Sequence, residues 1–226
     1  LLPSGRIFVN QYERMKTHMD REELFQRIRD GGPYPCGDKR IVEEQLPYLD
    51  KVFAYNRLPP SHQEEKLAML REMFAELGEG CYIETPFSAS WGGRYVHFGN
   101  RVYANYNLML VDDGEIYVGD DVMMGPNVIL CTATHPVHAD LRRAQVQYNL
   151  PVRVGKGVWI GGGSIVLPGV TIGEDSVIGA GSVVTHDIPA HVVAVGSPCR
   201  VLREVTEEER LYYRRGMKMD YDPEEA

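Results

Sequence analysis

The spacing of apolar positions changes along the chain, and the first part has the spacing of helices. From about Asp20 to Gly78 apolar residues recur every three or four positions, as in amphipathic helices. The first expected helix is capped by Asp20, and Pro47 kinks or divides the second. The third runs from a capping box at Ser61 and Glu64 to Gly78. The apolar faces of these helices are expected to pack in the protein core.

From Val96 onward the period becomes six, which fits neither a simple helix nor an alternating strand. In the later repeats an aliphatic residue leads each unit: Val154, Ile160, Val166, Ile172, Ile178 and Val184. Such a unit can form a short strand with one large side chain pointing inward, followed by a turn at Gly, Asn or Asp. Three units complete a coil, and stacked coils bury one continuous aliphatic column. The sequence therefore predicts a parallel β-helix.

One segment interrupts this period. The stretch CTATHPVHADLRR, residues 131–143, contains His135 and His138 beside a proline. Surface loops often carry binding and catalytic residues, so the loop that leaves the repeats, residues from about 136 to 151, is a candidate functional segment. The alternative interpretation is an ordinary loop with two surface histidines.

Composition narrows the class of protein. The 226 residues are 43% hydrophobic and 25% charged, with a formal net charge of −8. This charge argues against nonspecific binding to nucleic acid, and no apolar run approaches the about 20 residues that span a bilayer. We see no signal-peptide pattern, and the four cysteines form no C-x-x-C pair. These features predict a cytoplasmic protein with reduced thiols that binds neither membrane nor nucleic acid.

Four stretches carry a resemblance to a known family: NRVYANYNLMLVDD, THPVH, VWIGGGSIVLPGVTIGEDSVIGAGSVVT and GSPCRVLRE. Together they resemble the galactoside and maltose O-acetyltransferases, which are left-handed β-helix acyltransferases with hexapeptide repeats. The resemblance covers most of the chain from about Glu64 to Glu204. It implies a homotrimer with active sites between neighbouring β-helices. It also implies transfer of an acetyl group from acetyl-CoA to a sugar hydroxyl, with no metal required.

The expected fold class is therefore mainly β: a left-handed parallel β-helix with an N-terminal helical segment and a short C-terminal helix. We assign residues 1–19 to a poorly defined N-terminal segment and residues 20–80 to the helical segment. Residues 81–204 are assigned to the β-helix, and residues 205–226 to a C-terminal helix with an acidic tail.

Acetyl transfer to an alcohol needs a base for the hydroxyl proton and donors for the developing oxyanion. Imidazole is suited to take that proton near neutral pH. The resemblance places His135 in this role, and it leaves His138 a structural or rim role. It places four residues at the acceptor: Tyr103, Asn105, Asp113 and Ser90. Asp113 equally suits a plain turn beside Gly114.

The resemblance assigns the binding of acetyl-CoA to the last coils, namely to Trp159, Gly162, Ala180, Thr185, His186, Arg200 and Arg203. Trp159 would flank the pantetheine arm, the Gly162 N–H would face the thioester oxygen, and the arginines would meet phosphates. Gly162 and Ala180 have a second interpretation, because tight repeat corners require small residues in any case. Arg200 also fits a solvated arginine after the last coil.

Three positions depart from the family pattern. His186 stands where a lysine is usual, and the stretch SASWGGRYVHFG, which contains Ser90, is one residue longer. Gln45 aligns with an arginine of the acceptor site. Because two of the three departures concern the acceptor, a non-sugar hydroxyl, such as that of an antibiotic or of serine, stays an alternative.

Two further alternatives belong to other classes. A β-helix metalloenzyme would use His135, His186 and His191, but zinc requires three ligands in fixed geometry and no matching histidine lies about two coils earlier. A non-catalytic scaffold would keep the repeats and lose the base. The presence of His135 together with Asn105 and Trp159 argues against the scaffold.

Overall fold

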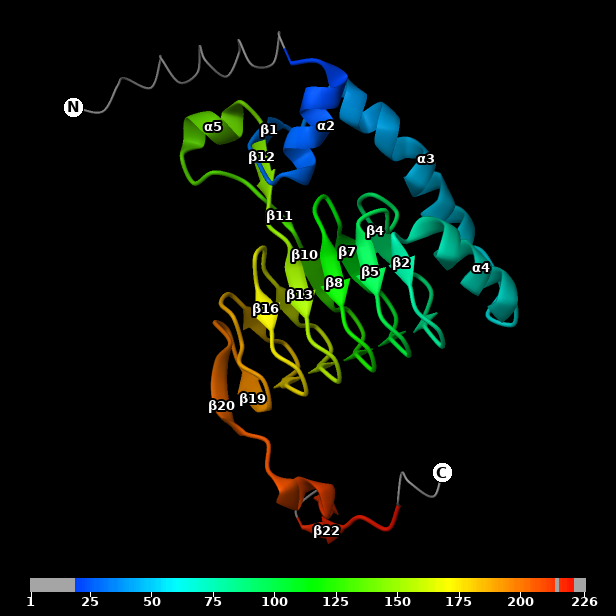
Figure 1. The fold of residues 1–226 in the computed structure, drawn as a ribbon, viewed down its shortest axis with the longest axis vertical. Coiled ribbons are helices and arrows are strands. Elements are labelled where there is room, and N and C mark those ends of the chain that lie inside the picture. The colour runs from blue at the N-terminus through cyan, green and yellow to red at the C-terminus, as the bar shows by residue number, and fades with distance from the viewer. Residues whose placement is uncertain (1–18, 214–215, 222–226) are drawn as a thin grey trace, which may run out of the picture.

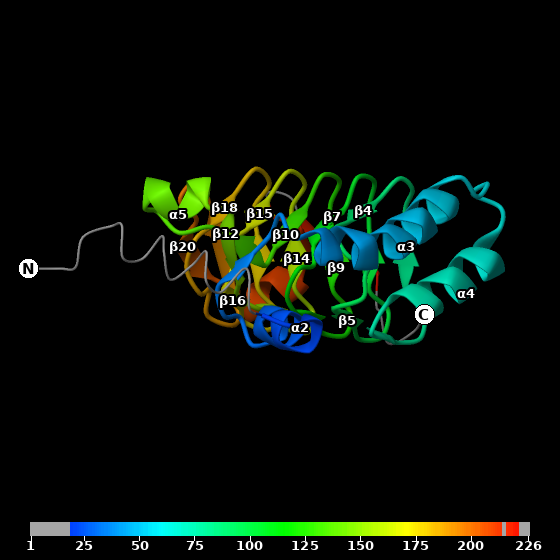
Figure 2. The same ribbon diagram turned by 90° about the horizontal axis from the view of Figure 1, so that it is seen from above.

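The six-residue repeats wind the middle of the chain into a prism of three sheets, parallel except for the antiparallel last strand of one sheet (Figure 1, Figure 2). The computed structural model describes residues 19–213 and 216–221, so the expected segment 1–19 lies outside the described residues except for Met19. Each coil contributes one short strand to each sheet, and strands of successive coils pair in parallel. The predicted β-helix of hexapeptide repeats is confirmed.

We name the sheets A, B and C in the order in which each coil visits them, and we name each corner by the two sheets that it joins. Sheet A contains β2 (Glu76–Leu77), β5 (Val96–Phe98), β8 (Ile116–Val118), β13 (Val152–Val154) and β16 (Thr171–Ile172). Sheet B contains β3 (Tyr82–Ile83), β6 (Tyr103–Ala104), β9 (Met123–Met124), β14 (Trp159–Ile160), β17 (Val177–Ile178), β19 (Val192–Val195) and β20 (Arg200–Glu204). Sheet C contains β4 (Ser88–Ala89), β7 (Met109–Val111), β10 (Ile129–Cys131), β15 (Ile165–Val166) and β18 (Val183–Val184).

The interior of the prism is an aliphatic column. All six leading residues of the later repeats are buried, and they join one cluster with Val96 and Leu110 of earlier coils. At the turns, the buried hydroxyls of Ser164 and Ser182 both donate to the carbonyl oxygen of Gly179, at 3.2 and 2.5 Å. The side chains that recur every six residues are thus buried by the stacking of coils, which no single coil could achieve.

Three helices precede the prism, as expected: α2 (Arg21–Arg29), α3 (Lys39–Asn56) and α4 (Gln63–Met73). Helices α3 and α4 lie against the first coils, whereas α2 lies further along the prism, beside β1 (Tyr34–Pro35) (Figure 1). Asp20 caps α2, because its carboxylate accepts the N–H of Glu23 at 2.9 Å. The α3 helix runs through Pro47 without interruption.

The third helix differs from its prediction at both ends. It begins at Gln63 with His62 as N-cap and has no side-chain capping bond, so the predicted capping box at Ser61 is wrong. It ends at Met73, because Leu77 pairs with Phe98 of β5 and is held as a strand residue. Pairing with the next coil thus overrides the helical spacing, and the β-helix begins at residue 76 rather than 81.

The interrupted repeat projects from the prism, as predicted. After β10 the chain forms β11 (Ala133–Thr134), α5 (Ala139–Arg143) and β12 (Val146–Asn149) before it re-enters sheet A at β13. Strand β12 pairs antiparallel with β11 and with β1 (Tyr34–Pro35) from the N-terminal segment. Figure 1 shows this small sheet standing above the prism beside α2. The N-terminal segment and the inserted segment therefore support each other.

The end of the chain corrects one expectation. Where a helix was predicted over residues 205–226, the described residues form one 3-10 turn, η1 (Glu207–Arg210), and a hairpin of β21 (Tyr212–Tyr213) and β22 (Met217–Lys218). The glutamates favour a helix start, but Gly216 adopts a positive φ of 81° that turns the chain back. Among the described residues, no helix is long and apolar enough to cross a bilayer.

Candidate active site

His135 lies at the C–A corner, where the inserted segment leaves the prism. Its side chain is exposed, and its Nδ1 lies 2.7 Å from the carbonyl oxygen of Val146 on β12. Because a carbonyl oxygen can only accept a hydrogen bond, Nδ1 carries the proton of the neutral ring. The lone pair of the neutral imidazole is therefore on Nε2. His138 is also exposed, and its Nδ1 accepts the N–H of Asp140 at the start of α5, at 3.3 Å.

Asp113 lies at the same corner in a polar network that ties it to the inserted segment. The Gln147 side chain donates to its carboxylate at 3.1 Å, and Asn149 donates to its backbone carbonyl at 2.8 Å. Tyr34 of β1 donates to Asn149 at 3.2 Å and accepts a hydrogen bond from Gln147. Burial raises the pKa of Asp113, and the bond from Gln147 acts in the opposite direction.

Ser90 lies one coil before Asp113, beside the turn that is one residue longer than the family pattern. Its carbonyl oxygen accepts from the side chain of Gln45 on α3 at 2.6 Å. Its hydroxyl faces Asp113 and favours the ionised carboxylate. Gln45 stands where the family pattern has an arginine. It therefore fixes the backbone of Ser90, a residue predicted to contact the acceptor.

The longer turn is held by a buried carboxylate. Asp112 accepts the backbone N–H groups of Trp91 and Gly93 at 2.7 and 2.9 Å. Gly92 and Gly93 both have positive φ, at 65° and 94°, so the turn depends on glycine's backbone freedom. Burial raises the pKa of Asp112 to about 7. The buried indole N–H of Trp91 has no hydrogen-bond partner among the described residues, and the Trp91 side chain, like that of Gln147, lowers the pKa of Asp113.

A second group of predicted residues lies at the B–C corner. Trp159 stands on the outer face of sheet B in register with Met123 and Tyr103, and its side chain is 51% exposed. Asn105 follows Tyr103 at the corner, where its side-chain oxygen accepts the N–H of Tyr106 at 2.7 Å. Gly162 and Ala180 occupy the same corner two and three coils later. Among the described residues, the N–H of Gly162 has no hydrogen-bond acceptor.

The remaining residues predicted to bind acetyl-CoA follow β18, the last strand of sheet C, along the chain. Thr185 and His186 lie at the C–A corner of a later coil, with the Thr185 hydroxyl 2.8 Å from Nδ1 of His186. Arg200 donates to the carbonyl oxygen of Cys199 at 2.7 Å. Arg203 forms two hydrogen bonds of 2.7 Å with the carboxylate of Glu209, so its charge is already paired within the chain.

One chain does not bring these two groups together. The C–A corner holds His135, Asp113 and Ser90, whereas the B–C corner holds Asn105 and Gly162, and sheet C lies between the corners. The three residues of β7 alone span about 10 Å at ~3.3 Å per residue. The predicted site residues therefore form two half-sites on opposite edges of one sheet.

Sequence reasoning missed Tyr34, Gln147 and Asn149, which complete the Asp113 half-site. They lie in segments without the six-residue period, so no repeat position marked them.

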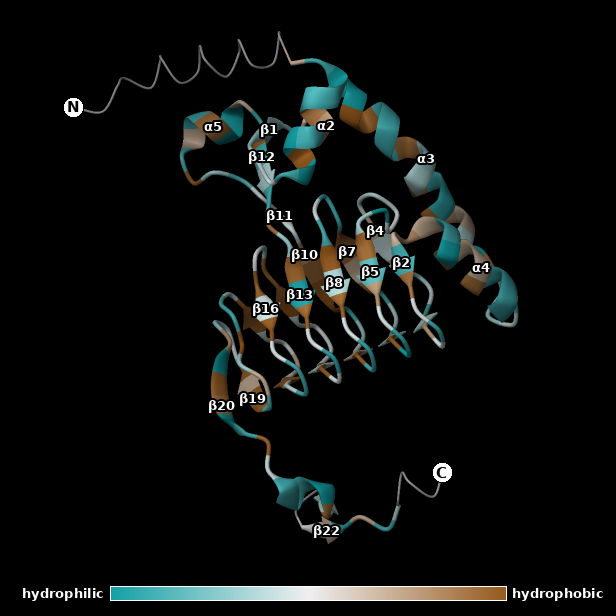
Figure 3. Ribbon diagram, viewed as in Figure 1, coloured by the Kyte–Doolittle hydropathy of each residue, from teal (hydrophilic) through white to brown (hydrophobic). Residues whose placement is uncertain are grey.

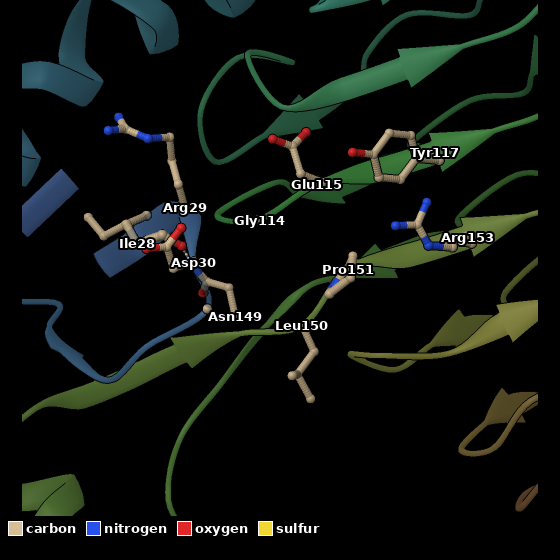
Figure 4. A pocket seen from close by; sticks show the side chains of 11 residues that line it. Ile28, Arg29, Asp30, Gly114, Glu115, Tyr117, Asn149, Leu150, Pro151 and Arg153 are labelled. Carbon is tan, nitrogen blue, oxygen red and sulfur yellow. Dashed lines mark hydrogen bonds between the residues drawn. The ribbon is translucent and has the colours of Figure 1, made fainter. Parts of the chain in front are cut away.

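A surface cavity of about 310 Å³ is bordered by Asn149 and lies between the end of α2 and sheet A (Figure 4). Arg153 packs there over the ring of Tyr117, 4.3 Å from its centroid. The cavity contains no predicted site residue.

The three histidines of the alternative metalloenzyme, His135, His186 and His191, do not lie together. His186 lies at the C–A corner, and His191 lies at the A–B corner beside Glu174 and Asp175. In the described part of the chain, Glu174, Asp175 and His191 are the one group of three potential ligands whose atoms lie within 4.8 Å of one another. Neither His135 nor His186 belongs to it.

Two protein families match the chain. The bacterial transferase hexapeptide (six repeats) family matches residues 151–186, and the maltose acetyltransferase hexapeptide capping motif matches residues 27–78. Their order along the chain, a helical cap before a β-helix, is the order seen in the structure. The fold and the repeats thus define a hexapeptide-repeat acyltransferase.

Individual relatives narrow this class. A galactoside O-acetyltransferase of Lactococcus lactis is 47% identical over 204 residues, which are 90% of this chain and 99% of the relative. The galactoside O-acetyltransferase of Escherichia coli is 42% identical over 197 residues, covering 87% and 97%. A solved galactoside acetyltransferase in complex with coenzyme A has a TM-score of 0.83 at 41% identity, covering 88% of this chain and 98% of that one.

A solved maltose O-acetyltransferase from Clostridium difficile has a TM-score of 0.79 at 38% identity, covering 81% and 98%. The chain belongs to the galactoside/maltose O-acetyltransferase family. The prediction of an acetyl-CoA-dependent O-acetyltransferase is confirmed at the level of this family.

Proposed function

We propose that the protein transfers the acetyl group of acetyl-CoA to a hydroxyl of a galactoside- or maltose-type sugar, with His135 as general base. The observation that carries this proposal is the 2.7 Å contact between His135 Nδ1 and the carbonyl oxygen of Val146. It fixes the tautomer that a base requires, with Nε2 unprotonated and exposed. Relatives named as galactoside and maltose O-acetyltransferases support the choice of acceptor.

The reaction proceeds by direct attack, without an acetyl-enzyme. Nε2 of His135 accepts the hydroxyl proton while the acceptor oxygen bonds to the thioester carbonyl carbon. The tetrahedral intermediate then expels the thiolate of CoA, which takes the proton back from the imidazolium. The free N–H of Gly162 is suited to donate to the developing oxyanion. Such a base contributes typically 10²–10⁴-fold.

The acceptor is assigned to the half-site around Asp113. With one carboxylate oxygen held by Gln147, the other oxygen is suited to accept from a sugar hydroxyl. Ser90 borders the same site, and Asn105 and Tyr103 are assigned to it from the opposite half-site. A network of fixed polar groups discriminates strongly for a hydroxylated ligand, because a ligand without the hydroxyl leaves buried polar groups unpaired.

The donor is assigned to the half-site around Trp159. Its indole is exposed beside the corner formed by Gly162 and Ala180, where the small residues let an extended pantetheine arm approach the backbone closely. Thr185, His186 and Arg200 are assigned to the outer part of the cofactor. Arg203 is assigned to a phosphate, in competition with its partner Glu209.

We further propose that the protein is a homotrimer that joins the two half-sites. The outer face of sheet C carries an apolar column of Met109, Ile129, Ile165 and Val183, whereas sheet A carries Glu76, His97, Tyr117, Arg153 and Thr171. An apolar face favours a subunit contact. A contact between the C–A corner of one copy and the B–C corner of the next is heterologous, and it closes into a ring of three when the rotation between copies is about 120°.

The test of the reaction measures free CoA released from acetyl-CoA with galactosides, maltose, serine and an antibiotic alcohol as acceptors. We expect release with a sugar and loss of that release in His135→Ala. Release that is fastest with serine or the antibiotic would replace the sugar assignment.

The test of the shared site mixes two inactive subunits. If His135 and Trp159 in one site come from different chains, co-refolded His135→Ala and Trp159→Ala subunits regain part of the wild-type activity. Neither variant alone regains it. A monomeric mass in sedimentation, with full activity, would contradict the trimer.

A further inference from the structure

The last part of the chain is exposed over its whole described length. We call residues 200–221 the C-terminal arm. Every described residue of the arm is exposed, although many are apolar: Val201, Leu202, Val205, Leu211, Tyr212, Tyr213, Met217, Met219 and Tyr221. Figure 1 shows the arm extending away from the last coil, and Figure 3 shows hydrophobic positions continuing into β20 and beyond. Soluble monomers rarely expose a contiguous apolar segment of this kind.

The arm nevertheless has a defined local structure. Thr206 and Glu209 form a capping box at η1, and Glu209 also pairs with Arg203 through two bonds of 2.7 Å. The N–H of Met219 donates to the carbonyl oxygen of Leu211 at 2.8 Å and closes the hairpin. A two-stranded hairpin on its own is marginally stable at best in water. Strand β20 is held by its pairing with β19, but no described residue of the arm is buried in its own chain, so its apolar side chains are available to a surface outside that chain.

The chain itself offers a matching surface. Strand β20 is the last strand of sheet B, so the arm continues from the sheet whose outer face exposes Met123 and Trp159. Val177 and Val193 extend the same column toward the arm. In a closed heterologous ring each copy gives one arm and receives one, so every arm is covered. This apolar column of sheet B is therefore continuous with the arm, and it borders the B–C corner that meets the next subunit in the proposed trimer.

We propose that the C-terminal arm packs its apolar side chains on a second copy of this chain. This inference rests on the proposed homotrimer and adds the segment that fastens one subunit to the next. The kind of partner follows from chemistry: an apolar, aromatic-rich arm meets an apolar sheet face of the same molecule. A ring fastened by arms dissociates less readily than the same ring held by sheet contacts alone.

Two variants of the full protein test the inference. The first is truncated after Val205, which keeps β20 paired to β19. The second is Leu211→Glu/Tyr213→Glu/Met217→Glu, which keeps the chain length. The matched control is Glu207→Gln/Glu208→Gln, which changes exposed polar residues of the same arm. Sedimentation over a dilution series measures the concentration at which each protein dissociates.

We expect both test variants to dissociate at concentrations about a hundredfold or more above that of the wild type, because several apolar side chains lose their cover. We expect the control to match the wild type. Wild-type and truncated proteins with the same dissociation concentration would overturn the inference, as would a monomeric wild type.

A cross-link identifies the occupant directly. A photoreactive amino acid replaces Tyr212 in a mixture of isotopically heavy and light chains. We expect cross-linked peptides that join one heavy and one light chain. Cross-links only between chains of the same label, in a mixture shown to exchange subunits, would place the arm on its own chain and overturn the inference. CoA release by the same proteins is scored separately, so a failure of the proposed reaction is distinguished from a failure of the arm.

Discussion

His135 Nδ1 and the carbonyl oxygen of Val146 lie 2.7 Å apart, across the two ends of the inserted segment. Val146 is held in turn by the pairing of β12 with β1, so the N-terminal segment helps to orient the histidine. We predict that His135→Ala lowers kcat by about 10²–10⁴-fold and leaves acetyl-CoA binding intact. Steady-state kinetics and a titration with acetyl-CoA check both parts.

His138→Ala is the matched control for this prediction. His138 caps the short helix α5 and contacts no predicted site residue, so its removal should leave kcat close to that of the wild type. Equal losses in the two variants would mean that the loop as a whole, rather than His135, carries the effect.

Gln147 holds the carboxylate of Asp113, and its loss should affect the acceptor alone. Hydrogen bonds to charged groups contribute about 1.5–3 kcal/mol. We therefore predict that Gln147→Leu lowers kcat/KM for the acceptor by about tenfold or more and leaves KM for acetyl-CoA unchanged. The exposed Gln26, whose side chain bonds Asp30 and Arg29, gives the control Gln26→Leu. An unchanged kcat/KM for the acceptor in Gln147→Leu would mean that the bond from Gln147 to Asp113 does not contribute to acceptor binding.

Asp112 should make stability depend on pH in an unusual direction. Burial raises its pKa from 3.8 to about 7, so the folded state binds this proton more tightly than the unfolded state. The contribution to stability is fully present below about pH 4 and is lost as pH rises to about 7, at up to ~1.4 kcal/mol per pH unit. Asp112→Asn cannot ionise, so the free energy of unfolding of the wild type relative to the variant should fall over this range. Urea titrations at several pH values check the slope, and a constant difference would contradict it.

His186 offers a gain of function on the donor side. A lysine there carries a full charge at neutral pH and can pair with an anionic cofactor. For an exposed pair we predict that His186→Lys tightens acetyl-CoA binding by about 0.2–1 kcal/mol, and that the gain shrinks as salt rises. Calorimetric titration at low and high salt, with His186→Ala for comparison, measures it. Identical affinities in all three proteins would remove His186 from the cofactor site.

Much of the prism could be predicted from the sequence because its period is strict. Val154, Ile160 and their successors each lead a unit of six, and each is buried. The insertion was also visible, since the period stops at Cys131 and resumes near Val152. Once the period of a repeat is known, it assigns each residue to an inward-facing strand position, an outward-facing strand position or a turn.

Where the period is absent, prediction from sequence was weaker. The third helix was expected to run to Gly78 because its local pattern could not reveal that residues 76–77 pair with the next coil. The Asp113 network joins Tyr34 to Gln147, 113 residues apart, through two segments without repeats. The assignment of half-sites to corners needed the order of the sheets. Local spacing does not encode such long-range contacts.

The inserted segment also has a consequence for how such enzymes diverge. Ile129 of β10 still pairs with Ile165 of β15, as if nothing had been inserted between their coils. The segment can therefore lengthen, shorten or be exchanged without shifting the register of any later coil. If the inserted segment lines the acceptor site, as proposed, its residues can change during evolution while the coils proposed to bind acetyl-CoA stay the same. Residues 136–151, which leave His135 in place, are therefore the natural segment to exchange with that of a relative.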